Sequence, residues 1–284
     1  MDYNFSDDLK AIREILGVTQ TELAKRLGVQ QVTLSRNELN KTTASDKLLE
    51  QVYSFAFDNG IKLGRLKEMM WLEILKPGHK LLFHGAKSEI EGEISVSRSR
   101  TNNDFGQGFY TGESYGQAIS FVSGFDRSSV YYLDFDESGL KRKHYKVDQE
   151  WMLTIAYYRG ALDEYREHPA VLKLIKEARD CDYIVAPIAD NRMFQIINSF
   201  IDGEITDEQC KHCLAAANLG NQYVFMSEHA ASKLIILERS YISSGERGYY
   251  KSLRTEETKL GDDKVKLARR QYRGKGKYID DILK

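Results

Sequence analysis

The chain has 284 residues, a formal net charge of −1 and 42% hydrophobic residues, a composition that supplies ordinary packed cores and excludes wholesale disorder. Its three cysteines are too few for a disulfide scaffold, so we expect a reducing, cytoplasmic setting. No apolar run reaches the roughly 18–20 residues of a membrane helix, and the acidic N-terminus does not match a secretory signal. The length favours one large domain with one small domain.

Residues 7–60 have the spacing of a bundle of short helices. The apolar positions of the first helix recur at helical intervals and stop at a glycine: Leu9, Ile12, Ile15, Leu16, then Gly17. Thr19 and Glu22 predict a capping box at the start of the next helix. Gly28 then suits the left-handed turn that ends this second helix.

The stretch from Thr19 to Val29 resembles the helix-turn-helix of the lambda-repressor-like family. Within it, Ala24 is small enough to let two helices cross closely. In the helix that follows, we expect Val32 to be buried beside Val29 and Leu34 to face the core. The resemblance implies a DNA-binding module that works as a homodimer, although such modules also serve as protein-docking units.

Side chains at the starts of these two helices are expected to meet DNA. Glutamine can pair with adenine, and arginine with guanine, through two hydrogen bonds each. We therefore expect base contacts from the start and exposed face of the second helix of the motif, at Gln30, Gln31, Thr33 and Arg36. Gln20, at the start of the preceding helix, is expected to bond a phosphate.

The end of the helical region is marked by composition. Residues 48–75 predict one or two further helices, and Lys76-Pro77-Gly78 predicts a boundary because proline and glycine together stop a helix. We therefore expect a helix-turn-helix domain with a helical linker over 1–76, a second domain over 79–243, and a polar, basic tail or helix over 244–284.

The second domain has an α+β pattern. Strands are expected at 81–84, 129–135, 182–186, 222–226 and 233–239. Helices are expected near 114–121, 149–159, 170–179 and 206–218, the last with a capping box formed by Thr206 and Gln209.

The segment from Asp104 to Thr111 combines two glycines with aromatic residues, and His84-Gly85 lies upstream at the end of a strand. Glycine lets a backbone approach a ligand closely, and aromatic faces attract flat cationic rings. Together with Asn221-Gln222-Tyr223, these peptides resemble the NAD-binding core of ADP-ribosyltransferases of the diphtheria-toxin and poly(ADP-ribose) polymerase type. The resemblance spans residues 80–240 and implies an ADP-ribosyltransferase-like split-sheet domain.

The resemblance also implies roles for the first two motifs. His84 would hydrogen-bond a ribose of NAD, and the backbone of Gly85 would hold the nicotinamide amide. Tyr110 would stack on the nicotinamide ring, and Phe121, eleven residues further on, would complete the sandwich. Other residues would line the cofactor: Phe105, Gly106, Gly108, Asp190, and Arg100 or Arg192 at the pyrophosphate, which suits a guanidinium fork.

The third motif departs from the family pattern, which is Asn-Glu-Tyr. Gln222 can bond the ribose 2′-hydroxyl but carries no charge, and losing one electrostatic partner at a developing cation typically costs about 2.7–4 kcal/mol. Slow turnover, transfer of a single unit or no transfer is therefore expected, with Glu228 as the alternative acid in a shifted register. The catalytic set implied by the resemblance is His84, Tyr110 and Gln222, without a metal.

The leading functional hypothesis is a mono-ADP-ribosyltransferase that consumes NAD. The motifs also resemble a narrower bacterial group described only as a domain of unknown function, which suggests a toxin or phage-defence effector with a small antitoxin-like partner. The alternative is a transcriptional regulator whose transferase-like domain senses NAD or docks a partner. An NAD glycohydrolase also fits, and the acceptor of ADP-ribose (protein, DNA or RNA) stays open.

Two further sequence features have simple explanations. Cys210 and Cys213 resemble half of a zinc site, but they share a helical face with Leu214 and Ala217, so we expect buried packing. The segment 264–277 holds seven basic residues and no acids, which fits either a nucleic-acid backbone or a solvated charged face.

Overall fold

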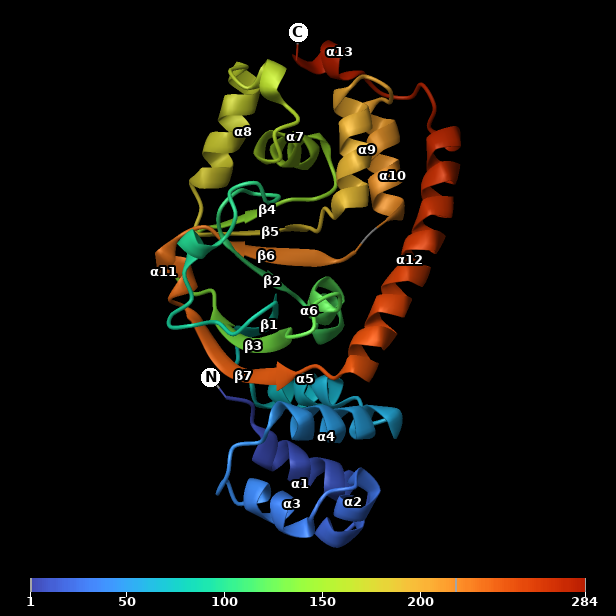
Figure 1. The fold of residues 1–284 in the computed structure, drawn as a ribbon. Coiled ribbons are helices and arrows are strands. Elements are labelled where there is room, and N and C mark those ends of the chain that lie inside the picture. Colours follow the sequence, from blue (N-terminus) through green and yellow to red (C-terminus); the bar gives the residue numbers. More distant parts are fainter. Residues whose placement is uncertain (1, 218, 284) are drawn as a thin grey trace. The chain divides into compact units, whose positions relative to one another are not determined.

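The computed structural model describes residues 2–217 and 219–283, which fold into two compact units (Figure 1). The first unit contains the chain up to Gly92 together with Ser114–Phe135 and Ile235–Leu253. The second contains Glu93–Glu113, Asp136–Leu234 and the chain from Arg254 onward. Each unit is therefore completed only when distant segments of the chain return to it.

The first unit begins with the expected helical bundle. Its helices are α1 (Phe5–Ile15), α2 (Gln20–Leu27), α3 (Gln31–Glu38) and α4 (Asp46–Asp58). The capping box is confirmed, because Thr19 Oγ1 accepts from the backbone N–H of Glu22 and the N–H of Thr19 donates to the Glu22 carboxylate. Gly28 ends α2 with φ of +67°, a left-handed conformation that glycine adopts without strain. The bundle closes on buried side chains from all four helices, including Leu9, Ile12, Leu23, Leu34 and Val52.

The same unit continues with helices and strands of the α/β region. These are α5 (Leu63–Ile74), β1 (His79–Ala86), α6 (Tyr115–Val122), β3 (Ser129–Asp136) and β7 (Leu234–Tyr241), with the strands in the order β1-β3-β7. A second apolar core lies here, built mainly from β1, β3 and α6 around Phe83, Tyr115, Ile119, Val130 and Tyr132.

The second unit contains the other strands, in the order β4-β5-β6-β2. They are β2 (Phe109–Gly112), β4 (Arg142–His144), β5 (Tyr183–Pro187) and β6 (Asn221–Phe225). β4 runs parallel to β5, whereas β5 and β2 are both antiparallel to β6. The domain that follows the helix-turn-helix is therefore α/β with mixed strand pairing.

Helices cover the core of the second unit. They include α7 (Gln149–Tyr158), α8 (Pro169–Arg179), α9 (Asn191–Ile201) and α10 (Asp207–Ala216), with α9 and α10 side by side (Figure 1). Shorter elements are η1 (Val96–Arg98), η2 (Asp163–Tyr165), α11 (Glu228–Ala231) and α13 (Ile279–Leu283). The basic C-terminal region belongs to a long helix, α12 (Ser244–Gln271), and the short segment that follows it. Cys210 and Cys213 are fully buried in this core, as the packing interpretation predicts.

Several local expectations are corrected by the structure. Val32 is 50% exposed rather than buried, because Leu34 alone of the two turns toward the bundle core. Thr206 does cap α10, but the side chain of Gln209 donates to the Arg269 carbonyl of α12, so the reciprocal half of the predicted capping box is absent. Neither β2, β4 nor α9 was expected, although the buried positions of α9 follow helical spacing: Met193, Ile196, Ile197 and Phe200.

Candidate functional site

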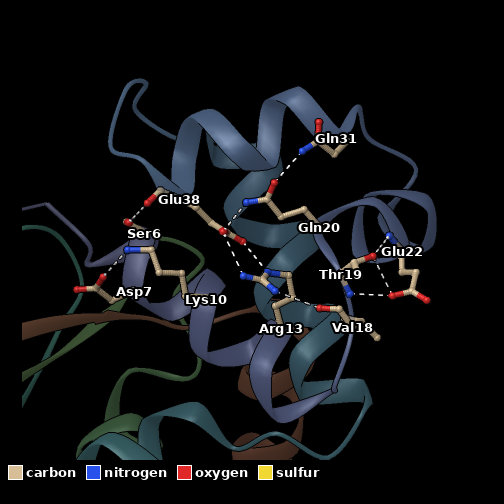
Figure 2. Close-up of polar contacts among 10 residues, drawn as sticks. All are labelled: Ser6, Asp7, Lys10, Arg13, Val18, Thr19, Gln20, Glu22, Gln31 and Glu38. Atoms are coloured by element: carbon tan, nitrogen blue, oxygen red, sulfur yellow. Dashed lines mark hydrogen bonds and ion pairs between the residues drawn. The ribbon is translucent and has the colours of Figure 1, made fainter.

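The exposed surface at the starts of α2 and α3 is organised by a chain of hydrogen bonds between these two helices, which Figure 2 shows. Gln31, the first residue of α3, donates through Nε2 to Oε1 of Gln20, the first residue of α2, at 2.7 Å. Gln20 in turn donates through its own Nε2 to Oε2 of Glu38 at 2.6 Å. Because each amide is held by the next group, the orientation of the Gln31 side chain is set before any DNA arrives.

This series of hydrogen bonds ends at the buried carboxylate of Glu38. Glu38 is 5% exposed, and Arg13 of α1 donates to it through Nε at 2.9 Å and through Nη2 at 3.4 Å (Figure 2). Ser6 of α1 also donates to the Glu38 carbonyl at 2.7 Å. A two-bond arginine contact fixes geometry as well as charge. The network therefore connects α1, α2 and α3 in one polar assembly.

The expected base-contacting side chains are accessible. Gln30, Gln31 and Arg36 are exposed and Thr33 is half-buried, so the outer surface of α3 can enter a groove. Val32 was left out of the candidate contacts because it was expected to be buried, whereas it is 50% exposed. An exposed apolar side chain between Gln31 and Thr33 can pack against a thymine methyl group.

In the second unit, Asp104 is the centre of a buried polar network. It is 5% exposed and pairs with Arg159 at the end of α7, whose Nη2 lies 2.5 Å from Oδ1. Oδ2 accepts from the backbone N–H of Ala189 at 3.1 Å and from Nε2 of Gln222 at 2.8 Å. Burial raises the pKa of Asp104, and the Arg159 guanidinium acts in the opposite direction.

Gln222 of the third motif is therefore a partner of Asp104. The side chain is 7% exposed, and its Nε2 donates to both Asp104 Oδ2 and the Pro187 carbonyl at 3.2 Å. The opposite amide orientation would direct Oε1 at a carboxylate and a carbonyl, which repel it. Both N–H groups of the Gln222 side chain thus have acceptors. Its oxygen, Oε1, is the remaining polar atom of the side chain, and it can only accept a hydrogen bond.

Tyr110 shares a sheet face with Gln222. Tyr110 pairs with Val224 and Gly112 pairs with Gln222 across β2 and β6, and residues two apart on a strand project to the same side. The Tyr110 hydroxyl accepts from the Phe105 N–H at 3.1 Å and donates to the Gly106 carbonyl at 2.8 Å. Burial raises the pKa of Tyr110. The phenol thus closes the loop that presents Asp104.

The two glycines of the Phe-Gly-x-Gly motif, Gly106 and Gly108, are required by close packing in the loop and against the sheet. Gly106 has φ of +74°, and a Cβ at this position would lie 2.8 Å from the Tyr158 ring. A Cβ at Gly108 would lie 2.8 Å from the Phe225 carbonyl of β6. Phe105 is fully buried, with its ring 5.3 Å from that of Tyr145. Close packing within the protein therefore accounts for these three residues without a ligand.

Three expected cofactor-binding residues belong to the first unit. His84 is half-buried on β1, and Phe121 on α6 is 43% exposed. A Cβ on Gly85 would lie 2.5 Å from the Ala118 carbonyl, so this glycine lets α6 pack against β1. The expected site thus takes residues from both units, and Phe105, Gly106, Gly108, Tyr110 and Gln222 are brought together in the second.

The remaining expected residues have varied surroundings. Asp190 accepts from the Met193 N–H at 2.9 Å and caps α9, while Arg100 is exposed. Arg192 is engaged by α12, donating to the Thr258 carbonyl and to Asp262. Glu228, the alternative acid, is exposed at the start of α11 and accepts from Ser95 at 2.7 Å.

Neither Asp104 nor Arg159 was expected to be a site residue. No local signal identifies either, because their partners are distant in the chain. The one available clue is that the acid directly precedes the Phe-Gly-x-Gly motif.

The fold and these contacts define a DNA-binding helix-turn-helix joined to an α/β domain. A helix-turn-helix family matches residues 9–52. The chain belongs to the family described as "Protein of unknown function (DUF3990)", whose match covers residues 81–235, more than half of the chain. No curated protein and no solved structure matches. Among the described residues, none of the helices has the length and apolar character needed to cross a membrane.

Proposed function

We propose that this protein is an NAD-dependent mono-ADP-ribosyltransferase carried to DNA by its helix-turn-helix, acting as a toxin or phage-defence effector. The observation that carries the proposal is the fixed carboxamide of Gln222. Its Nε2 is held by Asp104 and Pro187, so Oε1 is the acceptor available for a ribose hydroxyl. The order of the three motifs along the chain supports the same conclusion.

The chemistry requires orientation more than charge. Cleavage of the nicotinamide–ribose bond passes through an oxocarbenium-like state, which a properly placed acceptor at the 2′-hydroxyl helps to stabilise. Gln222 supplies a dipole here, while the Asp104 carboxylate behind it is neutralised by Arg159. We therefore propose slow transfer of single ADP-ribose units rather than chain growth.

The test is release of nicotinamide from NAD by the purified full-length chain, with and without cell lysate as the source of acceptors. Gln222→Ala is expected to lower the rate by about 10²–10³-fold, the range for loss of one transition-state hydrogen-bond partner. Gln195→Ala, an exposed glutamine of α9, is the matched control and should leave the rate unchanged. Absence of nicotinamide release by the unmodified protein would contradict the proposal.

A second candidate is a transcriptional regulator whose DUF3990 domain binds a nucleotide without turnover. The observation in its favour is that Gln222 and Tyr110 both make hydrogen bonds that maintain the fold. This candidate predicts that NAD changes the affinity for DNA while no nicotinamide appears. Relief of cellular toxicity by His84→Ala would count against it and favour the enzyme.

A further inference from the structure

The second unit contains a cleft of about 510 Å³, within the size range of small-molecule sites, at about 300–1,000 Å³. It lies between the loop 101–107, the end of α7 and the end of α8. Its walls include Thr101, Gly106, Tyr157, Tyr158, Arg166 and Arg179. A second hollow of about 370 Å³ shares Tyr157 and Arg179 with it and is also lined by Lys176 and Asp180, so the two hollows adjoin; together they are termed the groove.

Three basic side chains, Arg166, Lys176 and Arg179, line the groove together with one carboxylate, Asp180. No acidic residue is among those that line the larger cleft, and two arginines are. Arg179 is exposed in the last turn of α8, and among the described residues no carboxylate lies within ion-pair distance of it. The adjacent Asp180 is already paired with Lys141 at 2.5 Å. Arg166 forms an exposed ion pair with Asp163 at 3.5 Å, a weak contact that a phosphate can replace. Guanidinium groups suit phosphate oxygens because their donors form a planar fork.

Aromatic rings provide the other half of the lining. The Tyr157 and Tyr158 rings are 5.5 Å apart and nearly perpendicular, so they present two differently oriented surfaces. The Arg166 guanidinium lies 5.3 Å from the centre of the Tyr157 ring. Tyr158 and Arg179 line the same cleft, and burial raises the pKa of Tyr158 while the Arg179 guanidinium opposes that rise. Cations and ring faces are therefore neighbours within one groove.

We propose that this groove binds a nucleotide, with the phosphate held by Arg179 and Arg166 and the base stacked on Tyr157. The combination of the exposed Arg179 guanidinium, a tyrosine face and a glycine-containing loop matches the charge and the planar ring of such a ligand. The proposal goes beyond the proposed transfer reaction, because the two arginines are not among the residues expected to bind NAD, although the cleft shares Phe105 and Gly106 with that set. An occupant would touch Gly106, whose carbonyl accepts a hydrogen bond from the Tyr110 hydroxyl. It would therefore contact the same loop that carries Asp104, the partner of Gln222.

The experiment is isothermal titration of the full-length chain with AMP, adenosine and ribose 5-phosphate. AMP is expected to bind, and either fragment to bind at least about tenfold more weakly, because each lacks one of the two recognised groups. Arg179→Gln should weaken AMP binding by about tenfold or more, and the AMP affinity should fall with added salt. Arg142→Gln, an exposed arginine on β4 outside the groove, is the matched control and should not change it.

The outcomes separate this site from the proposed NAD site. Loss of AMP binding in His84→Ala with full binding in Arg179→Gln would overturn the proposal, because AMP would then occupy the NAD site. Absence of AMP binding, or Arg179-dependent binding only of a single-stranded oligonucleotide, would overturn it too. Absence of nicotinamide release by the unmodified protein would contradict the proposed transferase activity but would not affect the conclusion from AMP binding. Thermal melting of Arg179→Gln checks that the exposed substitution leaves the fold intact.

Discussion

The ammonium group of Lys67 on α5 donates a hydrogen bond to the carboxylate of Glu238 on β7, and both side chains are buried. The same ammonium group donates to Asp8 of α1 at 2.7 Å. Trp71 donates to the other oxygen of Glu238 at 3.0 Å, and Tyr53 donates to Asp8 at 2.5 Å. One lysine thus connects the helix-turn-helix to a strand of the α/β region within the first unit.

Lys67→Met should destabilise the first unit strongly. Removing the cation that pairs with two buried carboxylates leaves uncompensated charge, which costs about 3–5 kcal/mol in the free energy of unfolding. Urea denaturation followed by circular dichroism measures the loss. Lys10→Met breaks an exposed pair with Asp7 and should cost no more than about 1 kcal/mol. Equal losses in the free energy of unfolding for the two variants would show that the buried cluster stabilises the protein no more than an exposed ion pair does.

Glu246 should make stability depend on pH near neutrality. Burial raises the pKa of Glu246 from 4.5 to about 7, although the hydrogen bond from the Tyr115 hydroxyl at 3.1 Å lowers it in part. Because the folded-state pKa is above the ordinary value, this contribution to stability is fully present below pH 4.5 and is lost as the pH rises through 7.

Glu246→Gln removes this titration while keeping a polar partner for Tyr115. Relative to the variant, the unmodified protein should therefore lose up to about 3 kcal/mol between acidic and mildly alkaline pH. Denaturant midpoints of both proteins across that range give the difference directly. A constant difference between them at every pH would exclude the predicted titration.

Gln222→Glu restores the residue of the transferase pattern but should harm this protein. The new carboxylate would face Asp104 where Nε2 now donates at 2.8 Å, so the buried pair would repel. We expect a loss of about 1–3 kcal/mol in stability, partly recovered in acid as one carboxyl takes up a proton.

The matched control is Gln195→Glu on the exposed face of α9, which should stay within about 0.5 kcal/mol of the unmodified protein. Thermal melts at neutral and acidic pH measure both variants. Faster nicotinamide release by Gln222→Glu, with unchanged melting, would show that Asp104 does not constrain this position.

Gln20 and Gln31 should act as a unit on DNA. Gln31→Ala is expected to weaken binding to a selected duplex by about 1–3 kcal/mol, and Gln20→Ala should weaken it through the lost support at 2.7 Å. Fluorescence anisotropy with both single variants and the double variant gives the coupling, which should be clearly non-additive. Additive losses would mean that each glutamine contacts DNA independently.

Local chemistry made much of the helical region predictable. The capping box of Thr19 and Glu22 and the left-handed Gly28 involve groups a few residues apart, so they could be identified without a structure. Val32 was misjudged because an eight-residue helix offers too few turns to fix its buried side by periodicity. β2 was missed because a four-residue segment that follows one glycine and ends in another forms a strand only when β6 supplies its hydrogen-bond partners.

The sequence by itself determined the DNA-binding helix-turn-helix, the positions of most strands and helices, and the order of the glycine-aromatic and Asn-Gln-Tyr motifs, because these depend on neighbours along the chain. Only the tertiary structure decided what Asp104 does, since Arg159 and Gln222 lie 55 and 118 residues away from it. The same holds for the burial of Lys67 and for the arginine-tyrosine groove. Burial, ion pairing and cavity shape arise from groups that meet only when the chain has folded, so spacing in the sequence does not encode them directly.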